Sequence, residues 1–478
     1  MKPIGIIIVS FLLFWGAYQV RVGYIGTHAY NEPSDWKEYP QSIPGVRGLF
    51  VTFRQPEWVI KHNITALNIH GTPLYMLYAT FLSRYGLTPA MAAPVLHAAF
   101  VVLLFVVGQT LLPFGIAALV GAAAALYTPL YAFIYSWMPE TFTAVAIPTL
   151  AIAASMIVTK AKKPWLYGLA GFLVFLIGFS RHVFAYYGAA FILLWLLATP
   201  KRPSSQAWAL IAGYLLPTLA WNAILRWTGQ AVYVPGAIQS SLVVEHRLAT
   251  DGWGLDAIKG LTWWDAFFRV IVYQNPFSLF VLELERIARF LKTAANSYST
   301  SFPLSQYTLQ LLHTLILFFS AWGLRRAFKD KIVLLLASLV VWNTLFVVLY
   351  YVEEIRYQLP AVGLVLLVAG VGAGELISLL KNGRTRLSAV AIGALFLFWL
   401  FMGKGLIGWE LWLVPFIHDS NIWRWINIVL ATIVTAYATM KLHESDPRPK
   451  LVIAHRWMKR AYTLLPLAIY LIVLAPTL

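Results

Sequence analysis

The chain contains no cysteine and few acidic residues, with 19 Asp and Glu against 36 Lys and Arg. The lack of cysteine excludes disulfide bonds, thiolate metal ligands and cysteine nucleophiles. It does not identify a compartment, because a chain without thiols suits reducing and oxidising surroundings alike.

Charged residues of either sign make up only 12% of the chain, while 60% of the 478 residues are hydrophobic. Soluble domains average about 25% charged residues. Apolar runs approaching the roughly 20 residues needed to cross a bilayer recur throughout the sequence. We therefore expect an all-α polytopic membrane protein, with further helices beside the membrane in large outer loops.

The sequence predicts about thirteen transmembrane helices. They are 3–20, 88–109, 114–136, 142–159, 164–180, 183–199, 207–225, 307–324, 332–352, 359–380, 387–403, 424–440 and 461–478. The first run has no Ala-x-Ala cleavage site, which favours an uncleaved first span over a signal peptide.

The basic residues predict the orientation. With the N-terminus inside, the inner segments hold 19 of the 36 basic residues and only 4 of the 19 acidic ones. This matches the positive-inside rule and explains the net charge of +17 better than nucleic-acid binding does. Loops 21–87 and 226–306 then face outward, and 71–86 is expected to be an amphipathic helix at the outer interface. A crossing within 266–284 is the alternative, but it would need a second, compensating crossing.

Carboxylates follow several spans on the predicted outer side. They are Glu32, Asp35, Glu38, Glu140, Glu353 and Glu354. Solvated loop ends would explain each residue taken singly. Their gathering at one membrane face, from distant parts of the chain, instead favours a shared site.

Four motifs carry a resemblance to a known family. They are "SDWKEY" with Asp35, "IHGTPLYMLYATFLSRYG" before an interfacial helix, "YSWMPETF" with Glu140, and "EEIRYQLPAVGLVLLV" with Arg356 and Tyr357 opening a span. In order and side they resemble the GT-C superfamily of integral membrane glycosyltransferases, especially the branch of protein O-mannosyltransferases and the bacterial aminoarabinose transferase. The resemblance implies a catalytic core over 1–380, followed by C-terminal transmembrane helices over 381–478.

The resemblance also implies a reaction: transfer of a sugar from a polyprenyl-phosphate donor to a glycan, lipid or protein acceptor on the extracytoplasmic face. A bacterial inner membrane is the expected location. A carboxylate would act as general base, a role worth roughly 10²–10⁴-fold, and a single displacement would invert the anomeric centre. Asp35 is the expected base, followed by Glu38 and then Glu32. Glu140 would bind the acceptor or hold the base, or else simply suit the start of a helix.

Cations at the outer side are candidates for binding the donor phosphate. Arg356, beside Tyr357, is the first, with an ion pair to Glu353 or Glu354 as the alternative. Arg181 and His182 interrupt an apolar run and would contact phosphate or cap a tight turn. His70 is a further candidate substrate contact.

Other chemistries find little support. No histidine–carboxylate set has metal-ligand spacing, so no metal ligands are assigned, although a divalent cation stays open as a cofactor. A Gly-rich phosphate loop is also missing, which argues against direct use of a nucleotide sugar. The alternatives are a transporter or flippase of lipid-linked sugars, and a polysaccharide polymerase or ligase using arginines of the second outer loop.

Overall fold

The computed structural model describes residues 3–27, 73–83, 85–134, 139–181, 184, 187–199, 203–227, 303–304, 306–327, 329–350 and 358–381. Every regular element in these ranges is a helix, as expected. The helices are α1 (Pro3–Thr27), α6 (Pro73–Ser83), α7 (Pro89–Leu111), α8 (Phe114–Leu126), the 3-10 turn η1 (Thr128–Leu130), α9 (Pro139–Lys160), α10 (Pro164–Ser180), α11 (Tyr187–Ala198), α12 (Ser204–Trp227), α16 (Gln306–Ala327), α17 (Lys331–Tyr350) and α18 (Leu359–Lys381).

Proline opens several of these helices. Its fixed φ suits the first turn, where its missing N–H costs no hydrogen bond. Pro73, Pro89, Pro139 and Pro164 are each the first helical residue. Thr88 caps α7 by accepting a 3.1 Å hydrogen bond from the Met91 backbone N–H. Several predicted spans therefore start close to the observed helices, and α10 matches its prediction of 164–180 at both ends.

The predicted span 114–136 is wrong in its second half. The α-helix ends at Leu126, and the chain continues through η1. Pro129 cannot donate a backbone hydrogen bond and disfavours helical geometry at Thr128, so the α-helix stops there. With 13 residues, α8 is about 20 Å long, shorter than the ~30 Å hydrocarbon core.

The first span is longer than predicted. The predicted span ended at residue 20 and left Arg21 as the first residue of the outer loop, but α1 continues to Thr27 and buries Arg21 completely. The helix can include this cation because backbone carbonyl groups of α8 accept its hydrogen bonds.

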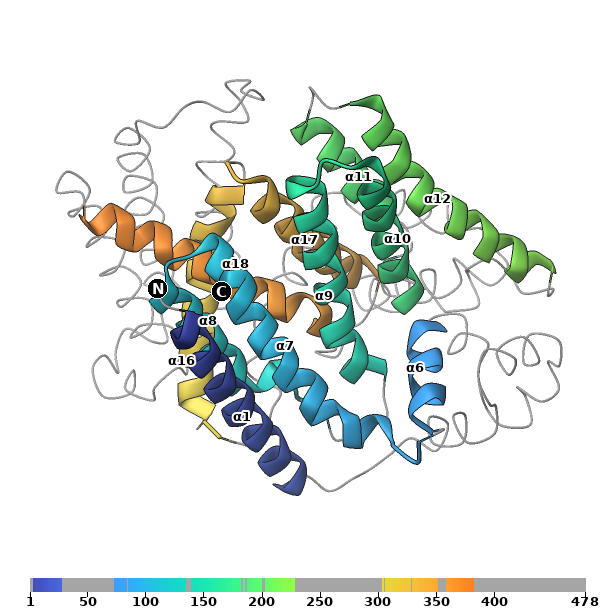
Figure 1. The fold of residues 1–478 in the computed structure, drawn as a ribbon. Coiled ribbons are helices and arrows are strands. Elements are labelled where there is room, and N and C mark those ends of the chain that lie inside the picture. Colours follow the sequence, from blue (N-terminus) through green and yellow to red (C-terminus); the bar gives the residue numbers. More distant parts are fainter. Residues whose placement is uncertain are drawn as a thin grey trace, which may run out of the picture.

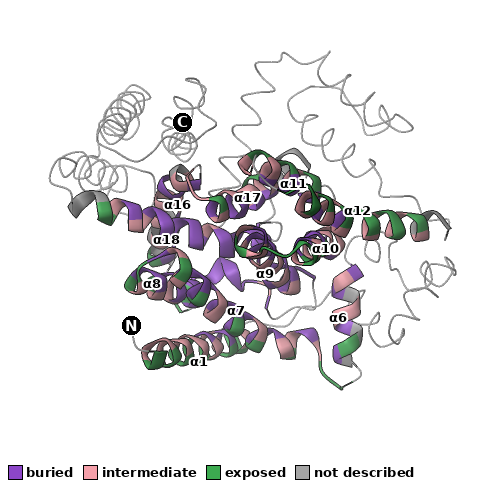
Figure 2. Ribbon diagram, turned by 45° about the horizontal axis from the view of Figure 1, so that its top comes forward, coloured by how far each residue is buried: buried purple, intermediate pink, exposed green. Residues whose placement is uncertain are grey.

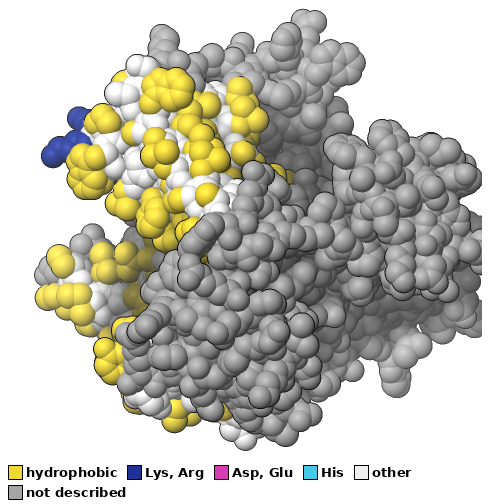
Figure 3. All heavy atoms as spheres, turned by 90° about the vertical axis from the view of Figure 1, so that its right-hand side faces the viewer, with side chains coloured by type: hydrophobic (Ala, Val, Ile, Leu, Met, Phe, Trp, Pro, Cys, Tyr) yellow, Lys and Arg dark blue, Asp and Glu magenta, His cyan; other side chains and the backbone are white. Residues whose placement is uncertain are grey.

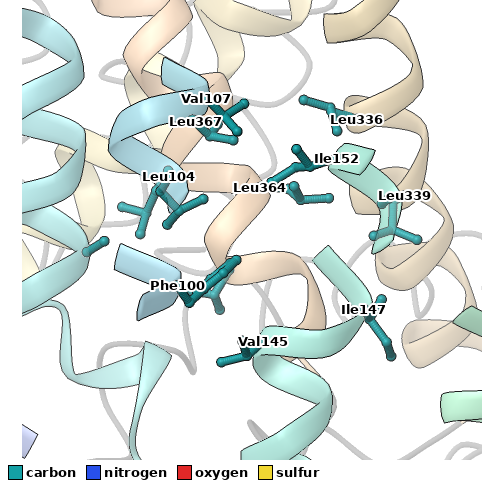
Figure 4. Packing of buried hydrophobic residues seen from close by; sticks show 14 of the residues in the cluster. Phe100, Leu104, Val107, Val145, Ile147, Ile152, Leu336, Leu339, Leu364 and Leu367 are labelled. Carbon is teal, nitrogen blue, oxygen red and sulfur yellow. The ribbon is translucent and has the colours of Figure 1, made fainter. Parts of the chain in front are cut away.

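Helix α9 lies in the middle of the bundle and contacts α7, α10, α17 and α18 (Figure 1). Buried side chains from α7, α9, α17 and α18 interlock there (Figure 4). The labelled members are Phe100, Leu104, Val107, Val145, Ile147, Ile152, Leu336, Leu339, Leu364 and Leu367. This cluster fixes α9, and with it the position of any side chain at the start of α9.

Glycine allows two pairs of helices to approach closely. A Cβ atom added to Gly213 on α12 would overlap the carbonyl oxygen of Gly168 on α10. Likewise, a Cβ atom on Gly372 of α18 would overlap the carbonyl oxygen of Phe319 on α16. Small residues at such crossings are typical of helix packing in membranes.

The outer surface of the described bundle is apolar. Figure 2 shows α1 and α12 with exposed faces, while α7, α9 and α18 are largely buried. Exposed residues on α1 and α12 include Ile7, Phe11, Trp15, Trp208 and Leu216. Figure 3 shows hydrophobic side chains over the described part of one face, with basic side chains at its edge. A soluble protein rarely exposes so much contiguous apolar surface.

Five described helices are long and apolar enough to cross a membrane: α1, α7, α9, α12 and α18. Shorter apolar stretches occur in α8, α10, α11, α16 and α17. The chain is thus helical, with the character of an integral membrane protein. The predicted spans 387–403, 424–440 and 461–478 lie outside the described residues, so the predicted total of thirteen is not confirmed.

Candidate functional site

Buried polar side chains gather where α1 and α10 end and where α7 and α9 begin. We call this region the polar end of the bundle; it includes the connecting segment 127–134. Its buried polar members are Arg21, His97, Thr128, Glu140, Thr141, Thr143, Ser180 and Arg181. Buried polar groups are costly unless they are hydrogen-bonded, so such a group of residues needs an explanation beyond packing.

An ion pair between Glu140 and Arg181 lies at the polar end. The Nη2 atom of Arg181 donates to Oε1 of Glu140 over 3.1 Å, and each side chain is only 6% exposed. The other carboxylate oxygen, Oε2, makes no hydrogen bond within the described part of the chain. Two sequence-predicted site residues, 41 positions apart, are therefore brought into contact.

The helix ends favour the charges of this pair. Glu140 lies in the first turn of α9, where the helix dipole stabilises an anion. Arg181 follows the last residue of α10, where the dipole stabilises a cation, and its backbone N–H bonds the Ile177 carbonyl oxygen. Glu140 does lie at a helix start, which was one alternative for it; the tight turn that Arg181 and His182 would cap includes residues outside the described ranges. The ion pair is an additional feature that these alternatives do not account for.

Arg21 holds the end of α8. Its Nη1 donates to the carbonyl oxygen of Ala125 over 2.7 Å, and its Nη2 to that of Ala124 over 3.0 Å. The guanidinium carbon lies 4.4 Å from the ring centroid of Tyr131, a cation–π geometry. The last carbonyl groups of a helix lack partners within the helix, and Arg21 supplies them.

Further hydrogen bonds attach segment 127–134 to its neighbours. The Tyr24 hydroxyl on α1 donates to the Ala132 carbonyl oxygen over 3.2 Å. The Thr141 hydroxyl on α9 donates to the Phe133 carbonyl oxygen over 2.7 Å. His97 on α7 bonds the Thr141 carbonyl oxygen through Nε2 over 2.8 Å, and since a carbonyl only accepts, Nε2 carries the proton. The segment is thereby tied to both α1 and α9, and α7 is tied to the start of α9.

Aromatic side chains of α6 pack against the start of α9. The rings of Tyr78 and Phe142 stack with centroids 4.6 Å apart, and Tyr75 lies 6.1 Å from Phe142. Burial raises the pKa of Tyr78 to about 12, so its phenol stays protonated at neutral pH. Tyr78 can therefore donate a hydrogen bond or offer a ring face, but it is no base. The predicted helix over 71–86 is observed as the shorter α6.

The seven other predicted site residues lie outside the described residues. These are Glu32, Asp35, Glu38, His70, His182, Arg356 and Tyr357. Their roles remain predictions. Of the nine predicted site residues, Glu140 and Arg181 are the two that lie within the described residues, and they contact each other.

Sequence reasoning missed Arg21, His97 and the pair formed by Tyr127 and His313. The Tyr127 hydroxyl and His313 Nδ1 share a hydrogen bond between the end of α8 and α16. A signal was present: Arg21 and His97 are lone ionisable residues in apolar runs, and such residues in membrane helices are commonly functional. Arg21 was instead taken as the boundary of a span.

The described part of the site can accept a hydrogen bond at Glu140 and can bind a negative charge beside Arg181. Within the described ranges, no group of three or more His, Asp or Glu residues could hold a metal ion. Comparison of the chain with models of known protein families gave no match, and comparison with curated protein sequences gave none either.

Proposed function

We propose that the chain is a membrane glycosyltransferase of the GT-C type. It would transfer a sugar from a polyprenyl-phosphate donor to a glycan, lipid or protein acceptor, with inversion at the anomeric carbon. The observation that carries the proposal is the buried Glu140–Arg181 ion pair at the polar end of the bundle.

The position of this pair supports the proposal. Tyr24 binds the segment that precedes α9, so the C-terminal end of α1 lies at the polar end. Helix α6 also lies there, against Phe142. Helix α6, which the motif "IHGTPLYMLYATFLSRYG" includes, therefore adjoins the end of the bundle that holds Glu140, and "SDWKEY" begins seven residues after α1 in the sequence. The sequence had assigned all of these positions to one membrane face.

The proposed chemistry divides the work among these residues. Asp35 is the base that removes the acceptor hydroxyl proton, with Glu38 and Glu32 as the nearest alternatives. Glu140 accepts a hydrogen bond from the acceptor or holds the base in place. Arg356 and Arg181 bind the donor phosphate, and Tyr357, His182 and His70 complete the substrate contacts. In this scheme the site faces the outside of a bacterial inner membrane.

A transporter of lipid-linked sugars is the second candidate, because two observations favour it. Ionisable residues are buried within helices, including Arg21 and Glu375, and α8 ends early, at Leu126, before segment 127–134. Transporters commonly place binding sites at broken helices. The two proposals differ in one measurable respect, since only a transferase breaks the bond between sugar and phosphate.

The deciding experiment uses purified protein in nanodiscs with a radiolabelled polyprenyl-phosphate sugar and a membrane extract as acceptor. The transferase releases polyprenyl phosphate and moves the label to the acceptor. Asp35→Asn keeps the size of the side chain but removes its basicity, and it should lower turnover by roughly two orders of magnitude or more. Glu38→Gln is the internal comparison: if it abolishes turnover while Asp35→Asn keeps turnover near normal, Glu38 is the base. If the donor stays intact with every acceptor fraction and is instead translocated across the bilayer, the transporter is the correct assignment.

A further inference from the structure

Segment 127–134, which contains the 3-10 turn η1, is buried within the stretch 114–136 that was predicted to be one regular span. Seven of its eight residues are buried. Non-helical backbone is tolerated inside a membrane only where protein or trapped water satisfies its polar groups. Here α1 and α9 satisfy them with side chains, and the way they do so bears on Glu140.

The anchoring bonds form a continuous path from α1 to the ion pair. Arg21 holds the carbonyl groups that precede the segment, and Tyr24 holds that of Ala132. The next carbonyl group, of Phe133, is held by Thr141. Thr141 directly follows Glu140 in the first turn of α9, so the path ends beside the carboxylate that binds Arg181.

We propose that Arg21 is a positioning residue of the candidate site: through segment 127–134 and Thr141 it sets the orientation of the Glu140 carboxylate toward Arg181. Arg21 touches neither residue of the pair in the described structure and therefore acts through the backbone that it holds. Its guanidinium suits this task because it binds two successive carbonyl groups while its face covers Tyr131.

Two features distinguish this role from simple helix capping. First, the segment is held from both sides, by Arg21 and Tyr24 on α1 and by Thr141 on α9, so a change on α1 is transmitted to α9. Second, two polar groups of Thr141 are anchored to neighbouring elements, its hydroxyl to Phe133 of the segment and its carbonyl oxygen to His97 of α7. Loss of Arg21 should shift the end of α8 and the segment together.

The test measures the state of the Glu140 carboxylate with a hydrophobic carbodiimide. Carbodiimides react with a protonated carboxyl group, and an ion-paired carboxylate reacts poorly. Mass spectrometry would quantify the adduct at Glu140 and, in the same sample, at Glu375 of α18, which is buried to a similar degree. The ratio of labelling at Glu140 to labelling at Glu375 corrects for general loosening of the fold, because loosening would raise both values.

We expect Arg21→Gln to raise relative labelling of Glu140 several-fold, toward the value of Arg181→Gln. Thr141→Val should also raise the relative labelling of Glu140. Arg21→Lys keeps the charge and a donor, so its relative labelling should lie between that of Arg21→Gln and that of the unchanged chain. Thr159→Val is the matched control on α9, because the Thr159 hydroxyl bonds only carbonyl groups of its own helix. Labelling of that variant should stay at the original value.

An Arg21→Gln variant with unchanged Glu140 labelling, or with equal increases at Glu140 and Glu375, would overturn the proposal. If that variant does not fold, Tyr24→Phe and Thr141→Val give the same test with smaller changes. A second arm rests on the proposed function: Arg21→Gln should lower kcat for sugar transfer by roughly tenfold to a hundredfold with little change in KM, as misorientation of a site does. The labelling arm needs no turnover, so absence of sugar transfer would count against the proposed function and not against the role of Arg21.

Discussion

Arg181 donates a 3.1 Å hydrogen bond to Glu140 across the open end of the helical hairpin formed by α9 and α10. Helix α9 begins with Pro139 and Glu140, α10 ends just before Arg181, and residues 161–163 connect the two helices at the opposite end. The pair therefore closes the open end of the hairpin. Because both side chains are buried, removing either one leaves a charge without its partner in a medium of low dielectric constant.

We expect Arg181→Met to lower the free energy of unfolding by about 3–5 kcal/mol, the cost typical of breaking a buried ion pair from one side. Glu140→Gln should cost less, because a neutral amide can still bond the guanidinium. Thermal unfolding of the detergent-solubilised protein, followed by its tryptophan fluorescence, measures both changes.

The combination of Arg181→Met with Glu140→Met supplies the control for this prediction. With both charges gone, most of the lost stability should return, since no isolated charge remains buried. Strictly additive losses in the double variant would mean that the two residues act independently, contrary to the observed contact.

The sequence was sufficient to predict a helical membrane protein and the approximate limits of the described helices. Hydrophobic runs determine helix lengths, and prolines such as Pro139 and Pro164 mark their starts. It failed at α8 because Pro129 lies inside an apolar run, and hydropathy alone cannot show that the helix ends while the apolar character continues.

The contact between Glu140 and Arg181 could be anticipated only as a shared membrane face. Which side chains meet depends on helix rotation and crossing, and those depend on packing between elements distant in sequence. Arg21 shows the same limit. A lone arginine at the end of an apolar run looks like a boundary, and only the neighbouring carbonyl groups of Ala124 and Ala125 explain why it is buried.

The crossing of α16 and α18 should be sensitive to a single methyl group. In Gly372→Ala the new Cβ would overlap the Phe319 carbonyl oxygen, so the helices must separate. Overpacking of this kind costs about 1–3 kcal/mol. Gly16→Ala on α1 is the matched control, because nothing lies within 4 Å of its added Cβ. Thermal unfolding should show a lower transition for Gly372→Ala and an equal or higher one for Gly16→Ala; equal transitions in both variants would contradict the close crossing.

The orientation can be tested without background, because the chain has no cysteine of its own. Ser204, at the exposed start of α12, is predicted to face the cytoplasm, and Ser34 the outside. An impermeant maleimide added to intact cells should label Ser34→Cys and not Ser204→Cys, while lysis should allow labelling of both. Labelling of Ser204→Cys in intact cells would reverse the proposed orientation.

The last prediction concerns recognition of the donor by Arg356. Its motif continues into α18, whose first residue Leu359 is buried, as is Gln358 before it. A phosphate leaving group gains negative charge as its bond to the sugar breaks, and a guanidinium that binds two oxygens stabilises that charge. A hydrogen bond to a charged group contributes about 1.5–3 kcal/mol, so Arg356→Ala should reduce kcat/KM for the polyprenyl-phosphate sugar by roughly tenfold or more. Arg356→Lys should recover part of this loss, since it keeps the charge but not the fork of donors.

Arg326→Ala is the control for this prediction. Arg326 lies near the end of α16 that is predicted to face the cytoplasm, so the variant removes the same charge from the other side of the bundle and should leave kcat/KM unchanged. The measurement is initial transfer rate at limiting donor, with the protein shown to be folded by its unfolding transition. If Arg356→Ala and Arg326→Ala lower the rate equally, the effect is one of general charge, and Arg356 has no specific part in binding the donor phosphate.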